Sequence, residues 1–200
     1  MANYRTSRII PIVLVIVIII IAIAALVSLA RVVFFSGSPT TTVQLDISRD
    51  ALLNTSVNHS VSMTVRGPIV ADEAFRSYKI DISPNARTIN TYEGYLKTVV
   101  DQTTLGNSVA SYEEFVNALD KANITKGKQL SEEKNDTSGT CATGSVYRFL
   151  VYDGTTIVKD LWTSTCSGSK GSLDASVTQV TNLFVKQIPG ADSLIRKVSL

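Results

Sequence analysis

The chain contains few of the residues that usually carry out catalysis. Among its 200 residues there is one histidine, His59, and the two cysteines do not form a CxxC motif. Histidine is the usual proton-transfer residue near neutral pH, and zinc sites need several histidine, cysteine or carboxylate ligands close together. We therefore expect no metal site, no redox-active thiol pair and no bound cofactor. The polar neighbours Asn58 and Ser60 predict that His59 is exposed at the end of a strand.

Sequence motifs of common enzymes are also missing. The chain has no Gly-x-Ser-x-Gly turn, no glycine-rich phosphate loop and no aspartate-rich calcium loop. Three pairs of adjacent carboxylates occur, but neighbouring side chains on a helix or strand point apart, so these pairs do not predict an acid–base site. A Ser/Lys dyad leaves no local signature. A hydrolase of the Ser/Lys type therefore remains the enzymatic alternative.

A strong excess of one charge is absent as well. Of 19 basic residues, Arg5, Arg8 and Arg31 lie in the first 39 positions, which leaves 16 basic and 17 acidic residues in the rest of the chain. Proteins that bind nucleic acids need a basic surface that neutralises phosphates. Nucleic acid is therefore not an expected partner.

The chain does have one long apolar run. The 22 residues from Ile9 to Ala30 carry no charge, and as a helix they would extend about 33 Å, enough to cross a bilayer. Arg5 and Arg8 precede this run, so the positive-inside rule places the N-terminus in the cytoplasm. The sequence predicts a cytoplasmic tail at residues 1–8, a single-pass transmembrane helix at 9–35 that contacts the lipid bilayer through 9–30, a tether at 36–42 and an extracytoplasmic domain at 43–200.

A cleaved signal peptide is the alternative interpretation of this run. Ser28 and Ala30 are small residues with the spacing of a cleavage site after Ala30. The run is nevertheless longer than the roughly 7–15 apolar residues of a signal peptide, and Arg31 follows it directly. These features favour an uncleaved signal anchor in the cell membrane.

Hydrophobic patterns after residue 43 predict an α+β fold. Alternation over residues 61–66 and 78–82 indicates half-buried strands, and a turn at Pro84-Asn85 places Ile80 opposite Ile89. Ser111 and Glu114 have the spacing of a helix capping box. An apolar helical stripe follows at Tyr112, Phe115, Val116 and Leu119.

A second amphipathic helix is predicted to begin near Ser172 and to stop at Pro189-Gly190. The polar segment Thr125–Thr140 predicts a mobile loop. Because two apolar stripes need a shared apolar surface, we expect an antiparallel sheet of five or six strands with two amphipathic helices on one face.

The two cysteines are predicted to form a disulfide bond. Asp153-Gly154 favours a tight hairpin turn, and Cys141 and Cys166 are equidistant from it. Two separate buried thiols are the alternative. The same hairpin register places Arg148 opposite Lys159, a repulsive pair that a bulged turn would remove.

Tyr92 and Tyr95 are the candidate binding residues. They flank Gly94 at the end of a predicted strand, where rigid amphipathic rings often contact a partner. The alternative is structural, with one ring packed on the core and the other covering it.

These observations predict a non-catalytic binding or scaffolding module of the cell envelope, whose partner is another envelope protein or a surface polymer. An N-terminal apolar helix, an α+β head and a late cysteine pair also resemble the architecture of type IV pilins. The resemblance implies a pilin-like surface assembly subunit as a further alternative. In this chain, however, the apolar run lacks the early glutamate of pilins, and the first acidic residue is Asp46.

Overall fold

The computed structural model describes residues 47–198, together with Ile18, Ile19, Ile21 and Ile23, which lie in a helix. Contacts within the chain separate a first unit, Met1–Gln44, from a second unit, Leu45–Leu200. The predicted tail, membrane helix and tether lie outside the described residues apart from the four isoleucines. In the described part of the chain, no helix has both the length and the apolar character needed to cross a membrane.

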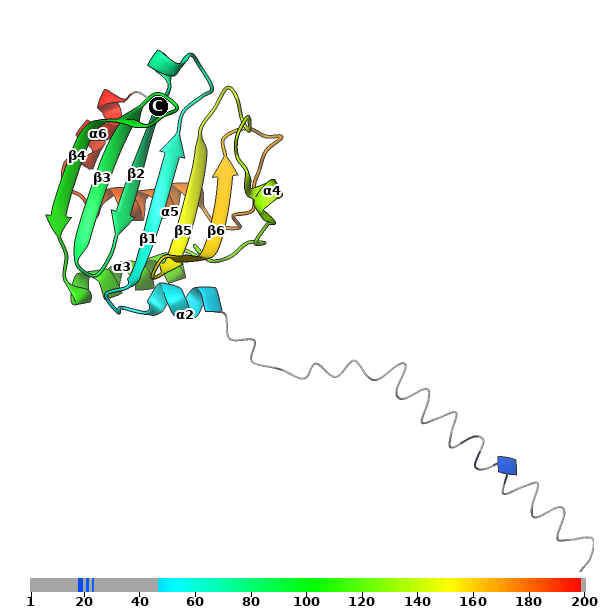
Figure 1. Cartoon of the computed structure of the whole chain (residues 1–200). Helices are drawn as coiled ribbons and strands as arrows, with labels where there is room; N and C mark the ends of the chain where they lie inside the picture. The colour runs from blue at the N-terminus through cyan, green and yellow to red at the C-terminus, as the bar shows by residue number, and fades with distance from the viewer. Residues whose placement is uncertain (1–17, 20, 22, 24–46, 199–200) are drawn as a thin grey trace, which may run out of the picture. The chain divides into compact units, whose positions relative to one another are not determined.

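The second unit is an α+β structure built on one six-stranded antiparallel sheet, which confirms the predicted fold class and strand number (Figure 1). The strand order is β4-β3-β2-β1-β5-β6. The strands are β1 (His59–Arg66), β2 (Arg76–Ile82), β3 (Ala86–Glu93), β4 (Thr98–Gly106), β5 (Val146–Asp153) and β6 (Thr156–Ser164). The helices are α2 (Ile47–Leu53), η1 (Asp72–Ala74), α3 (Val109–Lys121), α4 (Glu132–Asn135), α5 (Val177–Val185) and α6 (Ala191–Lys197).

Alternation along the strands gives the sheet two different faces. On β1, Val61, Met63 and Val65 are at most 2% exposed and belong to the core, whereas Thr64 and Arg66 lie on the opposite face. Figure 1 shows α5 and α6 behind the sheet, and residues of α3, α5 and α6 share the core with the strands. The predicted stripe of α3 is buried there: Tyr112, Phe115, Val116 and Leu119.

The β2–β3 hairpin has the predicted register. Ile80 lies opposite Ile89, and both side chains are fully buried. The prediction is confirmed because a tight turn and strict alternation together determine which residues face each other.

The β5–β6 hairpin has a different register from the predicted one. Asp153 pairs with Thr156, so the two-residue turn is Gly154-Thr155, and a bulge between Val151 and Tyr152 shifts the rest of the ladder further. Arg148 consequently lies opposite Trp162 and not opposite Lys159. The repulsive pair is thus avoided, and the predicted tight-turn register is wrong.

Helix α3 begins earlier than predicted. Its N-cap is Ser108, whose Oγ accepts a hydrogen bond of 3.2 Å from the backbone N–H of Ser111. Ser111 therefore lies inside the first turn, and the predicted capping box with Glu114 is wrong. Serine is a favoured N-cap at either position, so the sequence alone does not distinguish Ser108 from Ser111 as the cap.

Helix α5 begins later than predicted, after the N-cap Ser176, whose Oγ accepts from the N–H of Gln179. The predicted start at Ser172 is wrong because the N–H groups of Ser172 and Leu173 both donate to the carbonyl oxygen of Trp162. These bonds attach the segment to β6 instead of opening a helix.

The segment Thr125–Thr140 is folded against the sheet and contains α4, contrary to the predicted loop. Asn135 at the end of α4 is only 5% exposed. The side-chain oxygen of Gln129 accepts a hydrogen bond of 3.0 Å from the N–H of Asp160 in β6. The segment therefore provides a hydrogen-bond partner for a backbone N–H at the outer edge of β6, although it has almost no apolar residues.

His59 is buried, and its predicted exposure is wrong. The residue opens β1, which has β2 on one side and β5 on the other, and it is 7% exposed. Its Nε2 lies 3.4 Å from Oδ1 of Asp153, the paired residue of β5. A local sequence pattern does not show that this strand lies inside the sheet.

Candidate ligand-binding groove

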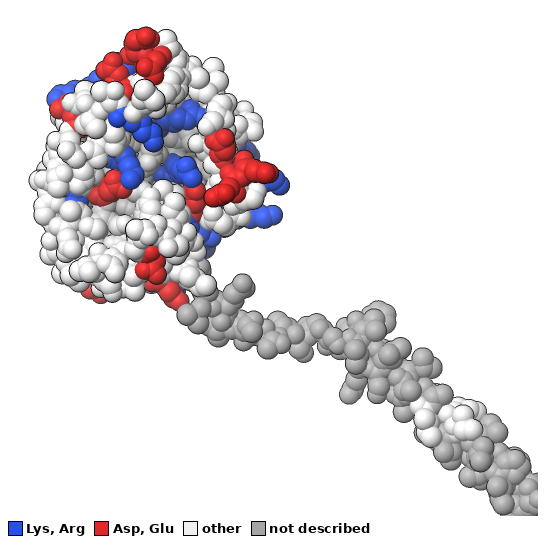
Figure 2. Space-filling model, in the orientation of Figure 1, with Lys and Arg blue, Asp and Glu red and all other residues white. Residues whose placement is uncertain are grey.

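A groove lies on the face of the sheet that faces the viewer in Figures 1 and 2. Helices α3, α5 and α6 cover the other face. The groove has a volume of about 490 Å³ and is lined by residues of β1, β2, β3 and β5, with contributions from the β3–β4 turn and the segment before β5. Small-molecule sites fall in the range of roughly 300–1,000 Å³. The groove is therefore large enough for a ligand.

The floor of the groove consists of side chains in rows that run across the strands. One row is Arg66, Ser77 and Tyr92, on β1, β2 and β3. The next row is Arg148, Thr64 and Lys79, on β5, β1 and β2. Paired residues of neighbouring antiparallel strands have Cα atoms about 4.5–5.5 Å apart. The two rows thus bring cations and hydroxyl groups into one small area.

All charged side chains that line the groove are basic: Arg66, Lys79, Lys97 and Arg148. Lys79 Nζ lies 2.7 Å from Asp81 Oδ1, and Arg148 donates two hydrogen bonds, of 2.9 and 2.5 Å, to Asp160. Among the described residues, Arg66 and Lys97 have no carboxylate partner. The groove lining is therefore positive overall. Figure 2 shows basic side chains over the middle of this face, with acidic ones beside them, at the top and on the side of α4.

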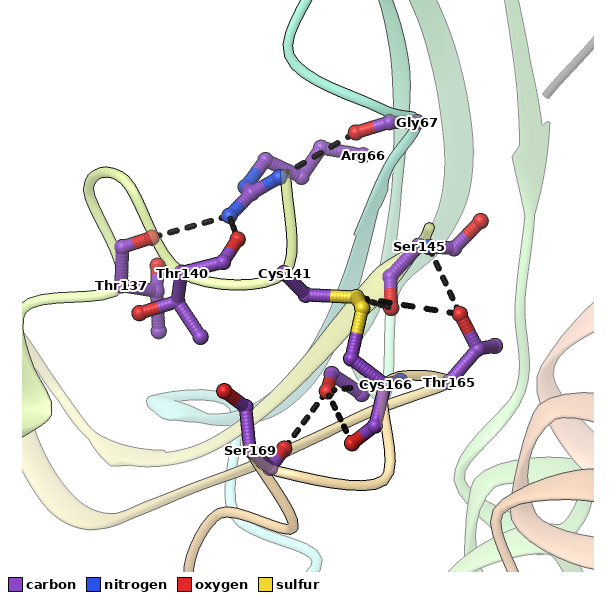
Figure 3. The surroundings of a disulfide bond; sticks show 10 residues. Arg66, Gly67, Thr137, Thr140, Cys141, Ser145, Thr165, Cys166 and Ser169 are labelled. Carbon is purple, nitrogen blue, oxygen red and sulfur yellow. Dashed lines mark hydrogen bonds between the residues drawn. A yellow bond between two sulfur atoms is a disulfide. The ribbon is translucent and has the colours of Figure 1, made fainter. Parts of the chain in front are cut away.

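Arg66 also holds one wall of the groove in place. Its guanidinium donates to the carbonyl oxygens of Gly67 at 3.2 Å, of Thr137 at 2.9 Å and of Thr140 (Figure 3). Burial lowers the pKa of Arg66, and Tyr95 opposes this effect to a smaller extent. The cation is therefore partly desolvated, with neutral carbonyl groups as its partners.

Cys141 and Cys166 lie at disulfide distance, with their sulfur atoms 2.08 Å and their Cα atoms 5.4 Å apart. Both cysteines lie just outside the strands, Cys141 before β5 and Cys166 after β6. Figure 3 shows that the chain passes from Thr140, the partner of Arg66, directly into this bond. Together with Val146 and Trp162, the cysteines form a second, small apolar cluster.

The two predicted binding tyrosines have different positions. Tyr92 lines the groove. Burial raises its pKa, while the neighbouring Lys79 cation partly opposes the rise. Tyr95 is 46% exposed, stacks on Phe75 with ring centroids 4.2 Å apart, and donates a hydrogen bond of 2.7 Å to the carbonyl oxygen of Val70. Because Phe75 lines the groove, Tyr95 supports the lining from outside.

Ser77 and Lys79 have the residue types of a Ser/Lys dyad and lie two positions apart on one face of β2. Burial of Lys79 by itself lowers the pKa, but the hydrogen bond and the attraction of Asp81 outweigh it, and the pKa of Lys79 is raised. A catalytic lysine base needs the opposite shift, because it must lose its proton near neutral pH. The contact with Asp81 and the raised pKa of Lys79 therefore do not support a role of this side chain as the base of a Ser/Lys dyad.

The groove cations were not identified from the sequence because they come from three strands, whose order it does not reveal, and from the β3–β4 turn. Alternation along β2 does place Ser77, Lys79 and Asp81 on the face opposite Ile80, and this pattern is the one sequence feature that indicates a polar sheet face.

The described residues contain no group of three or more His, Cys, Asp or Glu side chains that could hold a metal ion. Comparison of the chain with models of known protein families and with curated proteins finds no match.

Proposed function

We propose that the chain is a membrane-anchored, extracytoplasmic binding module of the cell envelope that holds an anionic ligand on the open face of its sheet. One observation carries the proposal: the groove on that face is lined by four basic side chains and by no acidic one. Apolar and aromatic residues, among them Leu150 and Tyr152, complete the lining. Ligand sites typically combine such a lining with a few polar groups that orient the ligand.

The proposed location rests on the sequence. The uncharged residues 9–30 are long enough for a bilayer, and the basic residues before them favour a cytoplasmic N-terminus. Disulfide bonds persist mainly in extracytoplasmic compartments, so the pairing of Cys141 with Cys166 supports this orientation.

The proposal is tested by binding to immobilised polymers. The full chain, kept in a neutral detergent, is passed over polyphosphate, polyglutamate and uncharged dextran. We expect binding to at least one anionic polymer, with an affinity that falls as salt is added because ions screen the attraction, and no binding to dextran. Equal binding to all three polymers, or to none, would overturn the proposal.

A matched pair of variants locates the binding surface. Lys97→Gln removes a groove cation without a carboxylate partner, and Lys186→Gln makes the same charge change at the end of α5, on the covered side of the sheet. We expect Lys97→Gln to weaken binding about fivefold, which corresponds to roughly 1 kcal/mol, and Lys186→Gln to leave it unchanged. Equal effects of the two variants would show that binding depends on net charge and not on the groove.

A further inference from the structure

We infer that the anionic group of the ligand is a phosphate and that it binds between Arg66, Ser77 and Lys79 at the centre of the groove. This inference rests on the proposed binding function and specifies its ligand chemistry. It is carried by an unpaired hydroxyl, by an incompletely paired cation and by the register that brings them together.

Ser77 supplies the unpaired hydroxyl. Its side chain lies on the groove face of β2 and the residue is 2% exposed. Its Oγ has no hydrogen-bond partner among the described residues. A buried hydroxyl without a partner is unfavourable, because it has lost water and gained nothing in return. A ligand oxygen that accepts a hydrogen bond from Ser77 would remove this deficit.

Arg66 is the direct neighbour of Ser77 across the β1–β2 ladder. Its three hydrogen bonds to backbone carbonyls use Nη1 and Nη2, and within the described structure its Nε–H has no partner. Within the described structure, no carboxylate pairs with the positive charge of Arg66, although the side chain is partly buried. An anion in the groove would therefore gain both a donor and an uncompensated positive charge.

Lys79 completes the set from the same strand. It lies two residues after Ser77 on the same face, and its contact with Asp81 favours the protonated form. Three donors thus line the groove from neighbouring positions of β1 and β2. Two of them are cations, and the Lys79 charge is shared with Asp81. A phosphate offers three terminal oxygens and up to two negative charges, whereas a carboxylate offers two oxygens and one charge. The donor set therefore fits a phosphate better.

The test uses calorimetric titration of the full chain with inorganic phosphate, glycerol phosphate and acetate. We expect both phosphates to bind at least about tenfold more tightly than acetate. Tighter binding of glycerol phosphate would show that the phosphate belongs to a larger organic ligand, and equal binding would show that free phosphate suffices. Acetate binding as tight as phosphate binding would overturn the inference.

Ser77→Ala tests the hydroxyl without a change of charge, and Ser62→Ala is its matched control. Ser62 lies on the same sheet face, is 1% exposed and also has an unpaired Oγ among the described residues, but it does not line the groove. We expect Ser77→Ala to weaken phosphate binding about tenfold, as loss of a hydrogen bond to a charged group does, and Ser62→Ala to leave it unchanged. Both variants should remain folded by circular dichroism, since neither loses a hydrogen bond.

Lys79→Gln is the second variant, in case Ser77→Ala disturbs the strand, and it should also weaken phosphate binding. Unchanged phosphate affinity in Ser77→Ala and Lys79→Gln would overturn the inference. If these variants bind phosphate normally while Lys97→Gln still binds anionic polymers poorly, the groove function stands and the phosphate site is wrong. If the full chain binds no anion at all, both proposals are wrong.

Discussion

Phe184 lies where three elements of the core meet. Its side chain is fully buried in α5. Its ring stands edge-on to Phe115 of α3, with centroids 5.2 Å apart, and 6.1 Å from the ring of Phe149 in β5. Such aromatic contacts add to the free energy gained by burial. Phe184 therefore connects α3, α5 and the sheet within the core.

Truncation of this side chain should destabilise the folded unit. We expect Phe184→Ala to lower the free energy of unfolding by about 3–5 kcal/mol, because it removes apolar contacts and leaves a cavity. The measurement is urea unfolding followed by circular dichroism. Leu96→Ala is the control, since Leu96 is 94% exposed, and it should change the free energy by less than about 0.5 kcal/mol. Similar losses in the two variants would contradict the described packing.

At the scale of elements, an ion pair links α2 to α3. Arg49 donates two hydrogen bonds of 2.8 Å to the carboxylate of Asp120. These bonds hold the pKa of Asp120 below its ordinary value of 3.8, although burial has a smaller opposing effect. The Asp120 side chain is 20% exposed, so the pair is partly screened by solvent.

This link should give stability that depends on pH. A carboxyl whose pKa is lower in the folded state stabilises the protein above its unfolded pKa and loses that effect as the pH falls through the folded pKa. We expect Asp120→Asn to lower the free energy of unfolding by about 0.5–1 kcal/mol at pH 7. The difference from the unchanged protein should shrink as the pH falls below 3.8. Urea unfolding at pH 7 and at a pH below 3.8 measures this difference. Glu113→Gln, on the exposed side of α3, is the control and should leave the free energy of unfolding unchanged at both pH values. If the loss of stability in Asp120→Asn were the same at both pH values, the ion-pair explanation would be contradicted.

Sequence patterns predicted the elements whose signals are local. The Ile80–Ile89 pair and the buried stripe of α3 follow from alternation and helical spacing, which neighbouring residues determine. The predicted start of α5 was wrong because the residues before the helix donate hydrogen bonds to the carbonyl oxygen of Trp162, at least ten residues earlier in β6. The groove was out of reach for the same reason, since Arg66 and Arg148 meet only through the β1–β5 pairing.

For the whole molecule, the disulfide joins segments that no regular strand pairing connects. Cys141 follows the segment that Arg66 binds, and Cys166 follows β6. Gly144 lies so close to this bond that a Cβ there would be 2.9 Å from the Sγ of Cys141 and would also clash with Thr165 Oγ1. The chain around the bond is therefore tightly packed, and it forms one side of the groove through Thr137.

Removal of this bond should lower the stability of the whole unit. In the loop-entropy model, a bond across 25 residues of sequence separation contributes about 3–4 kcal/mol. We expect the double variant Cys141→Ser/Cys166→Ser to lose up to that amount in urea unfolding, and reduction of the unchanged protein to have the same effect. A reducing agent should not affect the double variant. Equal stability of the oxidised protein and the double variant would contradict this role.

The two-faced sheet has a consequence for how such a protein can diverge. Successive residues of β2, such as Ser77 and Tyr78, serve opposite sides, one in the groove and the other in the core. Selection can therefore alter what the domain recognises by substitution at every second position and leave the intervening positions, which specify folding, untouched. Descendants of one ancestor could share this architecture and yet differ in the molecules that they hold.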